Sequence, residues 1–296
     1  MITTAQWKAL ASSIKSGQCT PFLGAGACVP TLPTGTELSR ALAAEFGYPL
    51  TDKDDLSRVV QFMALDARDA VFPKQEILKR FSTCGYPNFS GNEPHHVLAS
   101  MPLPVYLTTN YDDFMVKALE ASQRKPHRDF CRWKPDLAGH PSIWQADPGY
   151  RPSPDQPIVY HLHGCNMLAD SMVATEDDYI EFIYNIAKSG SMTKTVDRSW
   201  EMLPPAIMTS ISNHCLMFIG YRLLDWNFRI IFRWLVLSLR RTQTRLKISV
   251  QLSPTSDQHS DEKAQAYLRD YFHHVFDVTV FWGTADQFVS ELRGYV

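Results

Sequence analysis

Residues 103–120, LPVYLTTNYDDFMVKALE, decide how the rest of the chain is interpreted. The stretch begins with an apolar run at 104–107, typical of a buried strand, and ends in the pattern of an amphipathic helix. Between these lie the polar residues 108–112, where a simple turn would more often use Gly or Pro. A strand that delivers polar side chains just before a helix indicates a ligand-binding edge of an open α/β sheet. The alternative is that Asp112 or Asp113 only caps the helix, and we assign that cap to Asp113.

The composition is that of a globular protein with a substantial core. The chain has 296 residues, of which 45% are hydrophobic, and its formal net charge is −2. The near-neutral charge gives no electrostatic footprint for nucleic acid, so direct nucleic-acid binding is not expected. The longest apolar helical candidate, at 228–239, is too short to cross a bilayer, and the N-terminus lacks a signal-peptide core. We therefore expect a cytoplasmic protein without membrane attachment.

Strands that alternate with helices predict an α/β fold with a doubly wound, Rossmann-like parallel sheet. The expected strands lie at 19–23, 105–109, 158–163, 215–219, 247–252 and 278–282. We expect one domain over residues 1–296, with a helical insertion at about 50–100 and an irregular Pro-rich loop at about 123–157.

The cysteines give no sign of a metal site. There are six, and none forms a C-x-x-C pair. Their spacing suggests neither a zinc ribbon nor a disulfide framework. In a cytoplasmic protein the expectation is six reduced thiols and no bound metal.

A glycine turn, Gly24-Ala25-Gly26, follows the first expected strand and precedes a helix. This is the layout of a phosphate cradle, because glycines let a ligand approach the backbone and the amides at a helix start attract anions. The same three residues also make a common tight turn. Their position after the first strand favours the binding interpretation.

Other strand ends carry polar residues or glycine. They are Thr109, Asn110 and Asp112 after one strand, His163 after the next, and Gly220 with Asp225 after a later one. Because the carboxyl ends of parallel strands share one edge, we expect these residues to meet beside the glycine turn. Backbone for phosphates, an amide, a carboxylate and an imidazole together suit a dinucleotide and a reaction at its ribose. A histidine that ends a buried strand, as His163 does, is more often structural, but the accompanying motifs favour a functional role for His163. His161 is assigned a structural role.

Taken in order, these motifs resemble the sirtuin superfamily. Gly24-Ala25-Gly26 looks like its cofactor loop, residues 109–112 look like its Thr-x-Asn-x-Asp motif, and His163-Gly164 looks like its catalytic His-Gly. The chain lacks the paired zinc cysteines of histone-type members, and Cys28 stands where Ser is common. The pattern is more similar to bacterial sirtuin-like NADase domains of anti-phage defence, whose late motif resembles residues 218–227.

The resemblance implies an NAD+ hydrolase that cleaves the bond between nicotinamide and ribose, with NAD+ as substrate and no metal. Its product would be ADP-ribose or a cyclic isomer, and the effect would be NAD+ depletion in anti-phage defence. His163 would act as general base, for which an imidazole pKa near 6.5 is suitable. Asn110 would hold the ribose or the attacking water, and Asp112 would bind the nicotinamide side or support the developing positive charge. Further cofactor contacts are expected from Gly24, Ala25, Gly26, Cys28, Thr109, Gly220 and Asp225.

Two other functions compete with this one. The first is an NAD-dependent protein deacylase, against which the missing cysteine module argues. The second is a non-catalytic module that senses NAD or an ADP-ribose derivative, against which the presence of both Asn110 and His163 argues.

Partners also follow from the resemblance. An unrestrained NADase harms its own cell, and we expect no fused sensor, Argonaute or ATPase domain in this chain. The expectation is a homo-oligomer that joins a separately encoded regulator, with a HerA-type ATPase as the leading candidate. The N-terminal helix and the helix at 228–239 are the expected contact surfaces.

Overall fold

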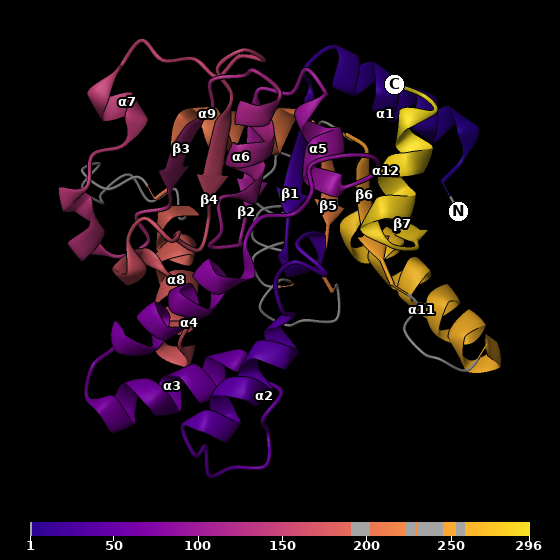
Figure 1. The fold of residues 1–296 in the computed structure, drawn as a ribbon. Coiled ribbons are helices and arrows are strands. Elements are labelled where there is room, and N and C mark those ends of the chain that lie inside the picture. Colours follow the sequence, from indigo (N-terminus) through magenta and orange to yellow (C-terminus); the bar gives the residue numbers. More distant parts are fainter. Residues whose placement is uncertain (1, 191–201, 223–228, 230–244, 253–257) are drawn as a thin grey trace.

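In the described part of the chain seven strands form one parallel sheet, which confirms the predicted doubly wound, Rossmann-like α/β class (Figure 1). The computed structural model describes residues 2–190, 202–222, 229, 245–252 and 258–296. Asp225 and nearly all of the expected helix at 228–239 lie outside the described residues. The strands are β1 (Cys19–Leu23), β2 (Val105–Thr108), β3 (His127–Phe130), β4 (Ile158–His161), β5 (Cys215–Ile219), β6 (Lys247–Gln251) and β7 (Thr279–Trp282).

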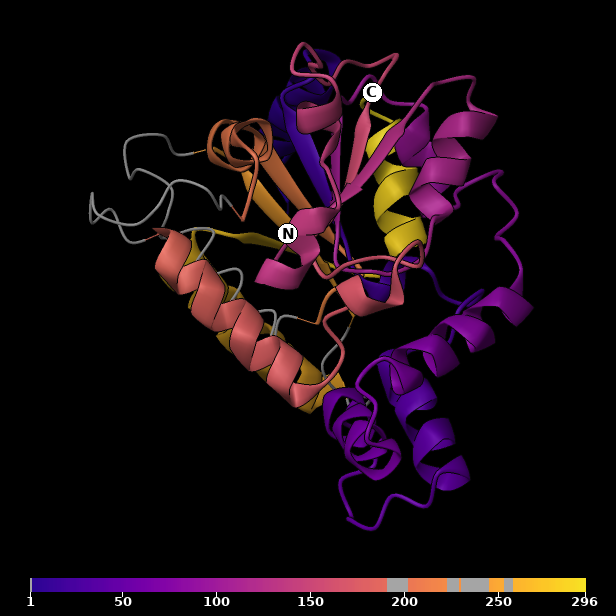
Figure 2. The same ribbon diagram turned by 90° about the vertical axis from the view of Figure 1, so that its left-hand side faces the viewer.

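Helices cover both faces of the sheet, which is why its central strands are continuous apolar runs. One face packs on α1 (Thr4–Lys15), α5 (Pro94–Ala99), α6 (Phe114–Ala121) and α12 (Ala285–Arg293). The other packs on α8 (Glu176–Gly190), α9 (Pro205–Asn213) and α11 (Gln258–Phe276). Figure 2 shows α8 and α11 on the same side of the sheet. No helix among the described residues is long and apolar enough to span a membrane.

The strand order places β1 at the point where the chain changes sides. The order is β3-β4-β2-β1-β5-β6-β7, so the chain leaves β1 toward β2 and later returns to β5 on the opposite side of β1. Leu23 at the end of β1 pairs with Thr108 of β2 and with Ile219 of β5. The three strands therefore end at one level, and open α/β sheets bind ligands above such a reversal.

A helical lobe lies beneath the carboxyl edge of the sheet (Figure 1). It consists of α2 (Gly35–Glu45), α3 (Leu56–Ala67) and α4 (Phe72–Cys84). Its own apolar core includes Leu42, Val59 and Ile77, and this core extends to Met172 and Ala174 of the main body. The lobe is thus anchored on the segment that follows β4.

The Pro-rich segment at 123–157 is more ordered than the sequence predicts. The irregular loop expected there is wrong in part, because it contains the edge strand β3, a 3-10 turn at Pro135–Gly139 and the short helix α7 (Ile143–Ala146). Among the described strands β3 pairs with β4 alone, and its sequence His-Arg-Asp-Phe lacks the apolar run of a central strand. An edge strand is covered on fewer sides and does not need that run.

The N-terminal helix uses its apolar face inside the molecule. Trp7 is 4% exposed and packs against the rings of Phe281, Phe288 and Tyr295. Burying such a side chain stabilises the fold by roughly 1.5–3 kcal/mol. Only the polar face of α1 is left to meet a partner.

Candidate active site

The glycine turn after β1 packs directly on the turn after β5. The Gly26 amide donates to the Gly220 carbonyl oxygen at 2.9 Å, and the Gly24 amide donates to the Ile219 oxygen at 2.9 Å. A Cβ on Gly24 would lie 2.8 Å from the Gly220 oxygen, and one on Gly220, whose φ is +81°, would lie 2.3 Å from the Ala27 nitrogen. These glycines are therefore required by the contact between two strand ends, whatever they offer a ligand.

The same contact limits the predicted phosphate cradle. The amides of Gly24, Gly26, Ala27 and Cys28 all donate to main-chain carbonyls. Ala25 and Gly26 are exposed. The turn therefore offers a ligand close backbone approach at these two exposed residues rather than a row of free amides.

Three of the predicted residues meet beside this turn. The Asn110 side-chain nitrogen donates to the Gly24 carbonyl oxygen at 3.1 Å and to the Cys28 sulfur at 3.2 Å. The Cys28 thiol in turn donates to Asp112 Oδ2 at 3.3 Å. Burial and the neighbouring Asp112 carboxylate raise the pKa of Cys28 well above its ordinary value. Cys28 is thus a protonated donor that links the amide to the carboxylate, and it is not a thiolate nucleophile.

The assignment of the helix cap to Asp113 is confirmed for its position at the start of α6, but not for its side chain. Asp112 Oδ1 accepts the Phe114 amide hydrogen at 2.9 Å, whereas the Asp113 side chain makes no capping bond at the start of α6. Asp113 instead accepts from the Tyr86 hydroxyl at 3.2 Å. Asp112 therefore uses one oxygen to begin a helix and the other to contact Cys28, and both bonds fix its carboxylate.

Thr109 directly follows β2, and its side chain reaches across the end of β1 to Tyr221, which follows β5. Its hydroxyl donates to the Tyr221 oxygen at 3.1 Å, and the Tyr221 hydroxyl donates to the Leu23 carbonyl oxygen at 2.9 Å. Burial raises the pKa of Tyr221, so the phenol remains a donor. Tyr221 is a structural member of the site that the sequence assignment omitted, although it belongs to the late motif after β5.

The side chain of His163 packs against α8. Its ring is 5% exposed, and the rings of Tyr179 and Phe182 meet it edge-on at 5.5 and 4.9 Å between centroids. Its Nε2 is buried and has no hydrogen-bond partner within the described ranges. Burial lowers the pKa of His163 to about 3, far from the value near 6.5 that suits a base at neutral pH. In this conformation His163 is a neutral and weakly basic imidazole.

The segment after β4 is hydrogen-bonded both to His163 and to the segment that carries Asn110 and Asp112. The Val173 amide donates to the His163 carbonyl oxygen at 2.9 Å, and the Tyr111 hydroxyl donates to the Val173 carbonyl oxygen at 2.6 Å. Tyr111 lies between Asn110 and Asp112 in the chain. A shift of this segment would therefore move the His163 imidazole together with the backbone that carries Asn110 and Asp112.

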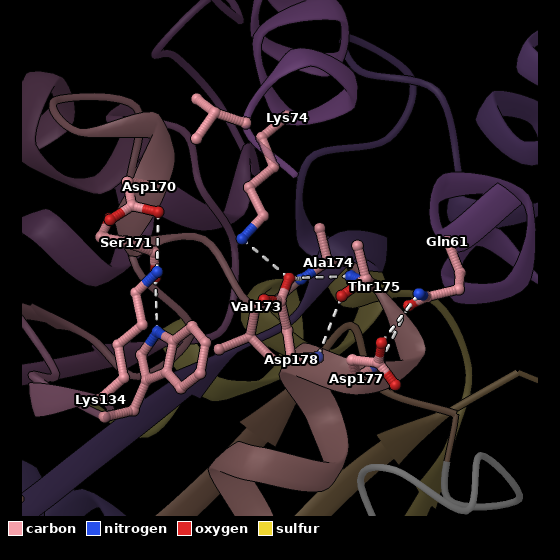
Figure 3. Close-up of polar contacts among 12 residues, drawn as sticks. Gln61, Lys74, Lys134, Asp170, Ser171, Val173, Ala174, Thr175, Asp177 and Asp178 are labelled. Atoms are coloured by element: carbon pink, nitrogen blue, oxygen red, sulfur yellow. Dashed lines mark hydrogen bonds and ion pairs between the residues drawn. The ribbon is translucent and has the colours of Figure 1, made fainter. Parts of the chain in front are cut away.

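A buried ion pair joins the helical lobe to that segment (Figure 3). Lys74 of α4 is 1% exposed, and its Nζ lies 2.8 Å from Asp178 Oδ2. The same oxygen accepts the amide hydrogens of Ala174 and Thr175, each at 3.0 Å. Leaving one partner of such a pair alone in the interior typically costs about 3–5 kcal/mol, so the lobe and the segment are strongly coupled.

Two adjoining pockets open from the glycine turn toward α12. One, of about 420 Å³, is lined by residues that include Cys28, Pro87 and Pro94, and the other, of about 490 Å³, is lined by residues that include Trp282 of β7. Asn92 and Asp286 line both. Among the described residues predicted for the site, Cys28 is the one that lines either of these two pockets.

The chain belongs to the SIR2-like domain family, whose model matches residues 104–276, more than half of the chain. This confirms the resemblance to the sirtuin superfamily, and the matched segment contains Asn110, Asp112, His163 and Gly220.

Two similar proteins are both named NAD(+) hydrolase ThsA. The one from Acinetobacter baumannii (strain 532279) is 26% identical over 167 residues, which are 56% of this chain and 31% of that protein. The one from Enterococcus faecium is 23% identical over 237 residues, which are 77% of this chain and 43% of that protein. The chain therefore spans less than half the length of these curated relatives.

Proposed function

We propose that this protein hydrolyses NAD+ to nicotinamide and an ADP-ribose product, and that it acts as an NAD+-depleting effector in anti-phage defence. The observation that carries the proposal is the bonded group of Asn110, Cys28 and Asp112 above β1, where the sheet reverses. The SIR2-like match and the two relatives named as NAD+ hydrolases support it.

The hydrogen-bonded group of Asn110, Cys28 and Asp112 supplies a fixed negative charge and an amide oxygen, and the reaction needs both. Nicotinamide leaves NAD+ as a neutral molecule from a cationic state, so the site must stabilise a positively charged ribose and position a nucleophile. The Asp112 carboxylate is fixed by two hydrogen bonds, and a preorganised charge of this kind stabilises a developing cation without reorganisation. The Asn110 nitrogen is already engaged, and we assign to its amide oxygen the contact with a ribose hydroxyl or the water.

His163 would act as the general base in a second conformation. Its Nε2 must face a hydroxyl or a water before it can take a proton. That requires the rings of Tyr179 and Phe182 on α8 to move away, and the hydration gained would return its pKa toward the ordinary value. The described conformation thus corresponds to a resting site.

Incubation of the purified protein with NAD+, followed by chromatography, tests the function. We expect nicotinamide and ADP-ribose or its cyclic isomer to appear in equal amounts as NAD+ is consumed. An acylated peptide added in parallel should stay acylated, because the proposed acceptor is water. Intact NAD+ after prolonged incubation with the protein in every assembly state tested would refute the proposal.

We also propose that turnover is controlled by assembly. A resting His163 requires a signal that moves α8, and a homo-oligomer with a separately encoded regulator, a HerA-type ATPase as leading candidate, would supply one. Mass photometry should then show a complex larger than one chain, alone or with that partner. Monomers under both conditions would rule out this part of the proposal.

A further inference from the structure

The main-chain carbonyl groups of residues 110–112 are held by two side chains, one from β3 and one from β4. His161 Nδ1 lies 2.8 Å from the Asn110 carbonyl oxygen. Arg128 Nη2 donates to the carbonyl oxygens of Tyr111 and Asp112, at 3.3 and 3.2 Å. Arg128 Nε also donates to His161 Nε2 at 3.0 Å. We call Arg128 and His161 the carbonyl clamp.

We propose that the carbonyl clamp is a positioning device for the reaction, with Arg128 as its main residue. The inference rests on the proposed function, because it assigns to the clamp the placement of Asn110 and Asp112 toward NAD+. Neither Arg128 nor His161 would touch the substrate.

The hydrogen bonds define the protonation state of the clamp. Because Arg128 donates to Nε2, that nitrogen must be the acceptor, and the proton of His161 therefore resides on Nδ1, from which it is donated to Asn110. Burial, and after it the Arg128 cation, lower the pKa of His161 to about 3. The imidazole is thus neutral across the physiological range, and the direction of the chain of bonds is fixed.

The clamp and the reacting groups act on opposite sides of one short backbone segment. The side chains of Asn110 and Asp112 reach toward β1, where they contact Gly24 and Cys28. The carbonyls of the same residues point to the clamp from β3 and β4. Removing the clamp releases the carbonyl side of residues 110–112. The side chains of Asn110 and Asp112 then shift, while Gly24 and Cys28 stay in place. Misplacement of a catalytic group by about 1 Å can lower the rate roughly 10²-fold.

A second arginine gives a matched control. Arg124 holds the main-chain oxygens of Ala99 and Met101, at 3.2 and 2.8 Å, and the Tyr106 hydroxyl at 2.9 Å. It therefore also binds several oxygens through one guanidinium, but it does so at the amino end of β2, away from the site. Arg124→Gln and Arg128→Gln each remove one positive charge and a similar set of hydrogen bonds. The bonds lost lie at the amino end of β2 in the first variant and beyond its carboxyl end in the second.

The test compares turnover and amide hydrogen exchange in the two variants. Arg128→Gln should lower kcat roughly ten- to a hundred-fold, more than it raises KM, and Arg128→Lys should recover part of the loss. Its exchange should accelerate at residues 109–114, where the amides of Asn110 and Phe114 are bonded to side chains. Arg124→Gln should keep the wild-type kcat below its melting temperature and accelerate exchange only at 98–106.

Each result decides a separate point. Wild-type kcat in Arg128→Gln, despite faster exchange at 109–114, would overturn the positioning role. Unchanged exchange at 109–114 would overturn the clamp itself. If the wild-type protein does not hydrolyse NAD+, the proposed function fails, and the positioning role fails with it, while the exchange data still establish whether the clamp holds the segment.

Discussion

Asn110→Ala is expected to lower NAD+ hydrolysis by roughly 10²- to 10³-fold, the usual consequence of removing one preorganised polar group from an active site. The substitution deletes the amide that bridges the Gly24 carbonyl and the Cys28 sulfur. Cys28 then loses a partner, and its thiol is left to Asp112 alone. The loss should appear mainly in kcat, measured as nicotinamide released by the folded variant.

Asn185→Ala is the matched control for that experiment. Asn185 is buried in α8, and its side-chain nitrogen donates to the Trp133 carbonyl oxygen at 2.9 Å. Its removal deletes a comparable amide-to-carbonyl bond in which none of the predicted site residues takes part. Each such bond contributes about 1 kcal/mol to stability, so the two variants should melt at similar temperatures and differ in turnover. Turnover in Asn110→Ala above about a tenth of wild type would exclude the assigned role.

Gly164→Ala is expected to lower the free energy of unfolding by about 4 kcal/mol or more. Gly164 follows His163 with a φ of +76°, and a Cβ there would lie 2.0 Å from the Ser171 carbonyl oxygen and 2.7 Å from the Met172 nitrogen. Both obstacles are backbone atoms, so no side chain can rotate to make room. The segment that carries His163 and Val173 must separate, and urea unfolding measures the cost.

Gly47→Ala is the control that separates the steric clash of the new Cβ from the cost of a positive φ. Gly47 has a φ of +66°, similar to that of Gly164, but a Cβ there would meet nothing within 4 Å. It should cost only about 1 kcal/mol, the penalty of a left-handed conformation. If both variants lost the same free energy of unfolding, the segment after β4 would be able to move away from the new Cβ at little cost, and it would not be a rigid support for the site.

The parts of the fold that the sequence predicts correctly are those with a local signal. The strands β1, β4 and β5 are apolar runs because they are buried on both faces. The carboxyl end of β2 could be recognised as part of a site because Asn110 and Asp112 are polar where a plain turn would use Gly or Pro. Parallel pairing then brings these ends together without further information.

What the sequence could not give depends on contacts between distant segments. Asp112 and Asp113 are equally good capping residue types. Asp113 occupies the N-cap position of α6, and only the folded backbone shows that the Asp112 carboxylate is the one that accepts the Phe114 amide hydrogen. The low pKa of His163 depends on rings of α8, and periodicity does not show which side of that helix meets the imidazole. Arg128 escaped notice because the edge strand that carries it lacks an apolar run.

The bonds at the carboxyl edge also constrain how the protein is made. Asn110 bonds to a residue 86 positions earlier, and Thr109 bonds to one 112 positions later. Closing such long loops is a late and slow event in folding. During synthesis on the ribosome the chain cannot complete this edge until Tyr221 has emerged, so unfinished chains lack the assembled site. Under the proposed function, a chain that is still being translated would therefore not yet consume NAD+.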